Sequence, residues 1–166
     1  MRKRTLTTAV LLVLVGSLAA AQRGRPRMFS PRPLAYATLD DFDGTFQFCR
    51  VVFRQGANGD GGSWNVDFPR ADENLSVRLS ELTKTPVGMD DDVPKHLLVS
   101  LQDPGPLSRC PFIMMTEVGA MFLDEQETKN LRDYLIKGGF LWVDDFWGER
   151  AWTVFETQIQ RALPSS

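Results

Sequence analysis

The chain has no excess of basic residues: its 166 residues include 19 Lys and Arg against 21 Asp and Glu, which gives a formal net charge of -2 and a pI near 5.4. A surface without a basic surplus does not attract phosphates, so no nucleic acid partner is expected. The one long apolar run, Ala9–Ala21, is shorter than the ~20 residues that span a bilayer. No membrane span is expected in the mature chain.

The chain also lacks the motifs of nucleophilic catalysis. No serine lies in a Gly-x-Ser-x-Gly elbow, and neither cysteine lies on a predicted strand-to-helix turn. His96, the single histidine, begins a predicted strand, at the edge opposite to the one where open α/β sheets bind ligands. In the glycine-rich loop, Gly62 stands where a phosphate-binding loop needs its lysine. We therefore expect no catalytic residue and no cofactor.

The N-terminal residues have the three parts of a secretory signal peptide. A basic start, Met1-Arg-Lys-Arg, precedes the apolar run, which ends in small residues at Ala21. We expect residues 1–21 to be cleaved, with an uncleaved anchor as the alternative. Residues 22–36 hold four arginines and three prolines and indicate a disordered, solvated linker. The mature protein, periplasmic or secreted, then consists of a domain over residues 37–166.

Two cysteines, Cys49 and Cys110, are compatible with either of two states. Export permits a disulfide between them, which would close a loop of about 60 residues. Two separate buried thiols are the alternative, because the distance that a bridge requires cannot be derived from sequence.

Short buried strands alternate with amphipathic helices along the domain, and this order favours a parallel sheet with helices on both faces. A helix that closes such a pattern normally leads into another strand, so the α/β domain is expected to be incomplete at its C-terminal end. The predicted strands are Phe46–Phe53, Leu97–Leu101, Phe112–Thr116 and Phe140–Asp145; the predicted helices are an apolar stripe from Ala71 to Leu82, then Asp124–Lys137 and Glu149–Leu163.

The helix after Thr116 carries the clearest boundary signals in the chain. Asp124 and Glu127 have the spacing of a capping box, and Gly138 suits the left-handed position after the last turn. Leu131, Tyr134 and Leu135 form the predicted inward stripe, and the charged residues of the helix, Glu127 among them, are expected to face water.

Ligands of open α/β sheets bind outside the carboxyl ends of the strands. In this chain those ends supply Asp103, Glu117, Asp144 and Asp145, with Trp64 as an apolar lid and Trp147 as a wall. A carboxylate cluster of Glu117, Asp144 and Asp145 would suit a divalent cation. The alternative is that these residues form turns and helix caps.

The runs Cys110–Met115, Thr116–Glu127 and Leu131–Gly148 resemble DUF4159, a bacterial domain of unknown function, and the likeness extends over residues 36–164. The resemblance implies a class I glutamine amidotransferase-like fold, a flavodoxin-like three-layer sandwich, without an established activity. The amidotransferase nucleophile is a cysteine on an elbow after a strand, and the turn from Glu117 to Met121 contains none. Many members of the family carry Gly-His near this turn, where this chain has Glu117-Val118.

Three functional hypotheses follow. The first is an exported, non-catalytic domain that binds a small ligand or an envelope protein at the carboxyl edge of the sheet. The second is a metal-assisted hydrolase that uses the carboxylates of Glu117, Asp144 and Asp145 with a divalent cation. The third is an envelope scaffold that docks a partner through the exposed aromatic residues Phe146 and Trp147.

Overall fold

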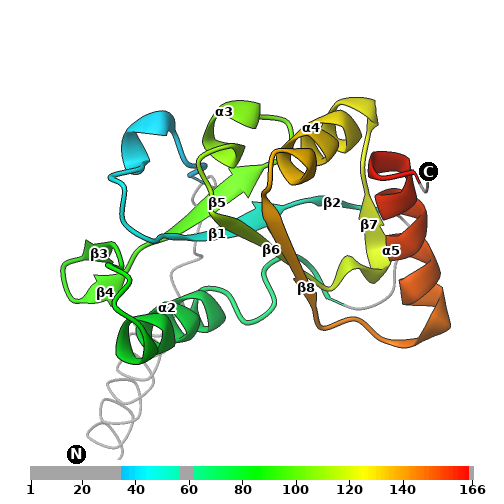
Figure 1. Cartoon of the computed structure of the whole chain (residues 1–166). Helices are drawn as coiled ribbons and strands as arrows, with labels where there is room; N and C mark the ends of the chain where they lie inside the picture. The colour runs from blue at the N-terminus through cyan, green and yellow to red at the C-terminus, as the bar shows by residue number, and fades with distance from the viewer. Residues whose placement is uncertain (1–34, 57–61, 165–166) are drawn as a thin grey trace, which may run out of the picture. The chain divides into compact units, whose positions relative to one another are not determined.

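Four parallel strands form the main sheet of the computed structural model, which describes residues 35–56 and 62–164. The strands are β1 (Phe48–Val52), β5 (His96–Ser100), β6 (Phe112–Thr116) and β8 (Phe140–Asp144), arranged in the order β5-β1-β6-β8 (Figure 1). This is the 2-1-3-4 part of the flavodoxin-like order. The predicted α/β fold with a parallel sheet is confirmed. The predicted signal peptide and all but the last two residues of the predicted linker lie outside the described residues.

Helices cover the two faces of the sheet unequally. On one face, α3 (Pro104–Leu107), α4 (Glu125–Ile136) and α5 (Gly148–Ala162) enclose the main core, and on the other α2 (Arg70–Leu82) packs near β1 (Figure 1). The core side chains alternate along the strands, as the period of two requires. They include Val51, Val99, Ile113 and Met115 from the sheet and Leu107, Leu131 and Phe155 from the helices.

Smaller elements extend the strand ends. β2 (Arg54–Gln55) continues β1 and pairs antiparallel with β7 (Met121–Phe122), while β3 (Met89–Asp90) and β4 (Val93–Pro94) form a hairpin within the predicted acidic turn. Two 3-10 helices, η1 (Leu39–Asp41) and η2 (Val118–Ala120), lie before β1 and after β6. The short α3 follows the predicted strand Leu97–Leu101, in a segment for which the sequence predicted no helix.

The capping box of α4 forms as predicted. The Asp124 carboxylate accepts a hydrogen bond from the Glu127 N–H at 2.9 Å, and the Glu127 carboxylate accepts one from the Asp124 N–H at 2.9 Å. Gly138 has φ +95, as expected after the helix end. The prediction that Glu127 faces water is wrong: the residue is buried because Arg54, from β2, pairs with it at 2.6 Å.

Two further expectations about burial are corrected. β8 is not a buried strand, since its side chains alternate between exposed and half-buried and Phe140 is 61% exposed. In α2, Leu82 is 82% exposed, whereas Asp72 and Ser76 are buried. Asp72 of α2 is buried because it faces Arg50 of strand β1, whose buried charge requires a polar partner.

A disulfide joins Cys49 of β1 to Cys110, which precedes β6, with their Cα atoms 6.0 Å apart.

In residues 35–56 and 62–164, no helix is long and apolar enough to cross a membrane.

Candidate functional site

The carboxyl ends of the strands meet at a topological switch point. From β1 the chain crosses to β5, which lies on one side of β1, and it then returns to β6, which lies on the other side of β1. The connections that follow β1 and β6 therefore lead towards opposite edges of the sheet. Open α/β sheets bind ligands at such a point. Here a cavity of about 230 Å³ lies on the α2 face of the sheet. Its lining comes from three strands and from the start of α2: Arg50, Val66, Asp67, Ala71, Met114, Thr116, Asp144 and Asp145.

Arg50, which lines this cavity, forms a buried ion pair with Asp72. Arg50 is 1% exposed and Asp72 is fully buried, and the Nε of Arg50 donates to the two carboxylate oxygens of Asp72 at 2.9 and 3.1 Å. Its Nη2 donates to the same carboxylate, and its Nη1 donates to the carbonyls of Trp64 and Val66 at 3.1 and 3.4 Å. Burial raises the pKa of the Asp72 carboxyl, while the hydrogen bonds and charge of Arg50 oppose that rise. The guanidinium therefore makes its hydrogen bonds to groups of the protein itself.

Left-handed backbone occurs at two residues that line the cavity, Asp67 and Asp145, and at Glu117, which is hydrogen-bonded to Asp145. Asp67, Glu117 and Asp145 have φ values of 58, 55 and 57, and the only other non-glycine residue of positive φ in the described ranges is Asp91, in the β3–β4 turn. Such backbone costs on the order of 1–3 kcal/mol per residue and clusters at functional sites. Three strained residues at one edge of the sheet therefore single out this edge.

Glu117 occupies the turn that follows β6 directly. Its backbone N–H donates to the carbonyls of Asp144 and Asp145 at 3.1 and 3.2 Å, which fixes the end of β6 to the end of β8. The residue is 9% exposed, and within residues 35–56 and 62–164 its carboxylate has no hydrogen bond or ion pair. Gly62 lies beside this side chain: a Cβ there would make ordinary contact with the Cγ of Glu117, at 3.4 Å, but would clash with the Cγ2 of Val66.

The structure brings some of the predicted site residues together and leaves others apart. Asp144 and Asp145 line the cavity, and Glu117 is hydrogen-bonded to their backbone. Asp103 instead caps α3, where its carboxylate accepts from the Gly105 N–H at 3.1 Å, as the alternative of turns and caps described. Trp147 is 75% exposed at the start of α5 and does not line the cavity.

Trp64 takes part in the site through its backbone carbonyl, and its side chain does not form the predicted apolar lid. Its carbonyl accepts from Arg50, and its half-buried ring packs against the core and lies 5.7 Å from the ring of Phe68. Most of the glycine-rich loop before it, residues 57–61, lies outside the described residues.

Six residues that line the cavity were not predicted as site residues, and four of them carry polar or polarisable side chains: Arg50, Asp67, Met114 and Thr116. One signal was available, because Arg50 is a single charge within the apolar strand Phe48–Val52 and so requires a buried partner. Asp67, Met114 and Thr116 carry no comparable signal, since each becomes part of the site through tertiary contacts.

A divalent cation requires several oxygen, nitrogen or sulfur ligands within its small radius. Throughout the described part of the chain, no group of three or more His, Cys, Asp or Glu side chains is placed to hold a metal ion.

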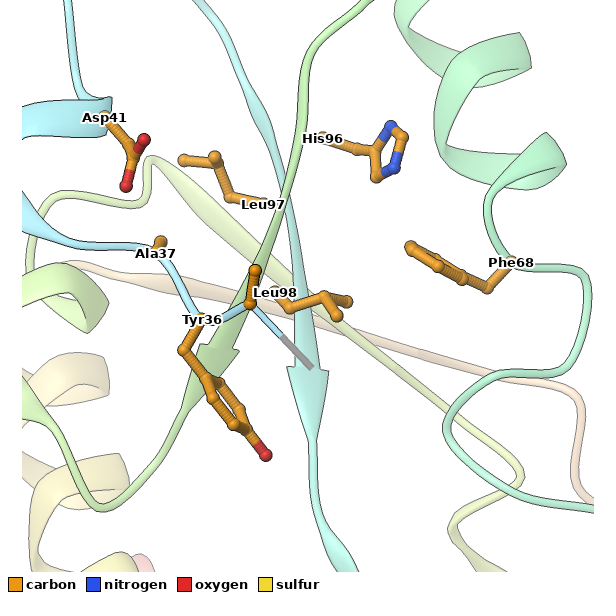
Figure 2. A pocket seen from close by; sticks show the side chains of 8 residues that line it. Tyr36, Ala37, Asp41, Phe68, His96, Leu97 and Leu98 are labelled. Atoms are coloured by element: carbon orange, nitrogen blue, oxygen red, sulfur yellow. The ribbon is translucent and has the colours of Figure 1, made fainter. Parts of the chain in front are cut away.

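A second, larger cavity of about 350 Å³ lies at the amino end of β5 (Figure 2). His96 and Phe68 lie on one side of the strand, with their rings 5.1 Å apart, and Asp41 lies on the other side. The Nδ1 of His96 is buried without a hydrogen-bond partner among the described residues. The histidine thus lies at the amino edge of the sheet, as predicted, and cannot serve as a base at the carboxyl edge.

The four-strand parallel sheet in the order β5-β1-β6-β8, flanked by helices, is consistent with a flavodoxin-like three-layer α/β sandwich. The family model described as "Domain of unknown function (DUF4159)" matches residues 47–166, and the chain belongs to this family. No curated protein and no solved structure in the comparison matches the chain.

Proposed function

We propose that the protein is an exported, non-catalytic domain that binds a small ligand in the cavity at the carboxyl edge of the sheet. The observation that carries this proposal is the 230 Å³ cavity at the switch point, where Thr116, Asp144 and Asp145 from two strand ends meet Asp67 before α2. The left-handed backbone of Asp67 and Asp145 in its lining supports the proposal, because backbone of this kind clusters at functional sites.

The lining favours a cationic ligand that donates hydrogen bonds. Asp67, Asp144 and Asp145 offer carboxylate oxygens, which accept hydrogen bonds and do not donate them when ionised. The guanidinium of Arg50 is neutralised by Asp72 and is not available to an anion. Because drug-sized ligands occupy about 300–1,000 Å³, a smaller cavity suits a small organic amine or one basic side chain.

A non-catalytic role is supported by the residue on the turn after β6. In the amidotransferase-like fold this turn carries the cysteine nucleophile, and here Glu117 occupies it. Both cysteines are joined in a disulfide, and the only histidine lies at the other edge of the sheet. Export is supported by the same disulfide, which is typical of oxidising compartments.

Calorimetric titration of the purified protein with lysine, arginine and putrescine, and separately with phosphate, tests this proposal. We expect the amines to bind, phosphate not to bind, and Asp145→Asn to weaken amine binding about tenfold or more, which corresponds to about 1.4 kcal/mol. Asparagine tolerates left-handed backbone, so the variant keeps the turn. Asp92→Asn makes the same chemical change at an exposed position outside the cavity and serves as the control.

Binding that is equal in wild type and Asp145→Asn would refute the proposed site. Turnover of an ester, amide or glycoside that Glu117→Gln abolishes would refute the non-catalytic role. Calcium, magnesium, manganese and zinc belong in the same titration, because tight binding of one of them that requires Glu117 would favour the metal-assisted hydrolase instead.

A further inference from the structure

Arg50 is the only cationic side chain among the described residues that line the cavity at the carboxyl edge. A free guanidinium binds carboxylates and phosphates readily, because its planar donors match two oxygens at once. Taken alone, Arg50 would therefore favour an anion in this cavity. Asp67, Asp144 and Asp145 in the same lining favour a cation instead. Which ligand charge the cavity selects thus depends on whether the guanidinium is free.

Asp72 occupies most of the donors of this guanidinium, although it does not line the cavity itself. Its fully buried carboxylate accepts from the Nε of Arg50 at 2.9 and 3.1 Å and also from Nη2. The other donors are used as well. Nη1 donates to the carbonyls of Trp64 and Val66, and Nη2 donates to the sulfur of Met114 at 4.0 Å. Every nitrogen of the guanidinium therefore has a partner within the protein.

The surroundings hold both members of this ion pair in place. The Cζ of Arg50 lies 5.8 Å from the ring centroid of Phe48 and 6.0 Å from that of Phe68, and aromatic rings attract a guanidinium at such distances. Asp72 lies in the first turn of α2, where the helix dipole favours a negative charge. The two side chains therefore form a fixed pair without net charge in the wall of the cavity.

We propose that Asp72 determines the charge selectivity of this cavity, because it neutralises Arg50 and leaves the field of the lining carboxylates unopposed. This inference rests on the proposed function, since it concerns the same cavity. It assigns a role to a residue that does not touch the ligand, so Asp72 is a positioning residue that acts through Arg50. Without the carboxylate of Asp72, the guanidinium would repel an ammonium group and attract a carboxylate.

Calorimetric titration of the purified protein with four-carbon ligands of different charge tests this role. Putrescine carries two positive charges, butylamine carries one, and succinate carries two negative charges. In Asp72→Asn the guanidinium keeps its charge without a counter-ion, so putrescine should bind about tenfold or more weakly than to wild type. Butylamine should lose less affinity than putrescine, and succinate should bind more tightly than to wild type. A purely structural defect would instead weaken both amines by the same factor and would not favour succinate.

The double variant Arg50→Met/Asp72→Leu provides a second test that does not depend on whether Asp72→Asn folds. It removes both charges, and apolar replacements of a buried ion pair often preserve stability. Because the guanidinium is then absent, putrescine should bind with an affinity within about threefold of the wild-type value. Glu81→Gln removes the carboxylate of an exposed ion pair on the same helix, and this control should leave all affinities unchanged.

The outcomes separate this inference from the proposed function. Identical ligand preferences in wild type and Asp72→Asn would overturn the role of Asp72, even if wild type binds putrescine. A double variant that binds putrescine at least about tenfold more weakly than wild type would also overturn it. If wild type binds neither amine, the proposed function fails, whereas tighter succinate binding by Asp72→Asn would still support the role of Asp72.

Discussion

Replacement of one partner of the Arg50–Asp72 pair tests how strongly the stability of the fold depends on this buried ion pair. Both side chains are almost completely buried, and the N–H groups of the arginine face the aspartate or the carbonyls of Trp64 and Val66. In Asp72→Ala, the guanidinium keeps its charge in the interior and loses its counter-ion. We expect this variant to lose about 3–5 kcal/mol of unfolding free energy.

The double variant Arg50→Met/Asp72→Leu should behave very differently. It removes both charges and fills the space with apolar atoms, and replacements of this kind are often neutral or even stabilising. We therefore expect the double variant to be more stable than Asp72→Ala by at least about 3 kcal/mol. Since domains are stable by about 5–15 kcal/mol, Asp72→Ala should be close to the threshold of folding.

Urea unfolding followed by tryptophan fluorescence measures these differences, with the slope checked for two-state behaviour. The exposed pair of Arg78 and Glu81, one turn apart on α2, is the matched control. Glu81→Ala should cost no more than about 0.5 kcal/mol, because water already solvates both charges. If the single substitutions at Arg50 and Asp72 prove mild and add up to the effect of the double variant, the two side chains are not coupled and the reasoning fails.

Three further outcomes are expected. Glu117→Gly should be more stable than Glu117→Ala by about 1 kcal/mol in urea, because φ at this position is 55 and glycine adopts left-handed backbone without strain; equal stabilities would contradict that strain. Replacement of Cys49 and Cys110 by alanine should cost about 4 kcal/mol, since the disulfide closes a loop with a sequence separation of 61; a thermal midpoint that stays the same would contradict it. The backbone N–H of Glu127, followed by hydrogen bonds from Gln102 and Arg54, lowers the pKa of Asp124 below its ordinary 3.8. The stability that this carboxylate contributes is therefore present above pH 3.8 and lost as the pH falls through the lower folded value. Asp124→Asn should flatten this acid limb of the stability profile, and a profile parallel to that of wild type would contradict the assignment.

The sequence predicted the elements whose signals are local. The strand Phe112–Thr116 was predicted at its observed bounds, and the cap at Asp124 and the turn at Gly138 were predicted correctly, because each depends on residues within one or two turns of chain. Parallel pairing followed from the alternation of strands and helices.

Burial was predicted less well, because it depends on which elements lie opposite one another. Glu127 is buried since Arg54 reaches it from a strand that lies 73 positions away in sequence. β8 lies half-exposed because, among the described strands, it pairs with β6 alone, although its own residues, Phe140 to Val143, are apolar enough for a central strand. A hydrophobic pattern reports what a segment can bury, whereas its position in the sheet decides what it does bury.

The residues of the candidate site also divide into those that local sequence preference explains and those that depend on tertiary contacts. Asp67 and Asp145 adopt left-handed backbone, which aspartate does more readily than most residues, so local preference accounts for part of their conformation. Glu117 has no such preference, yet it holds the left-handed turn after β6 and is largely buried as a residue. The conformation of Glu117 is therefore set by tertiary structure, because its backbone N–H donates to the carbonyls of Asp144 and Asp145 across the ends of β6 and β8.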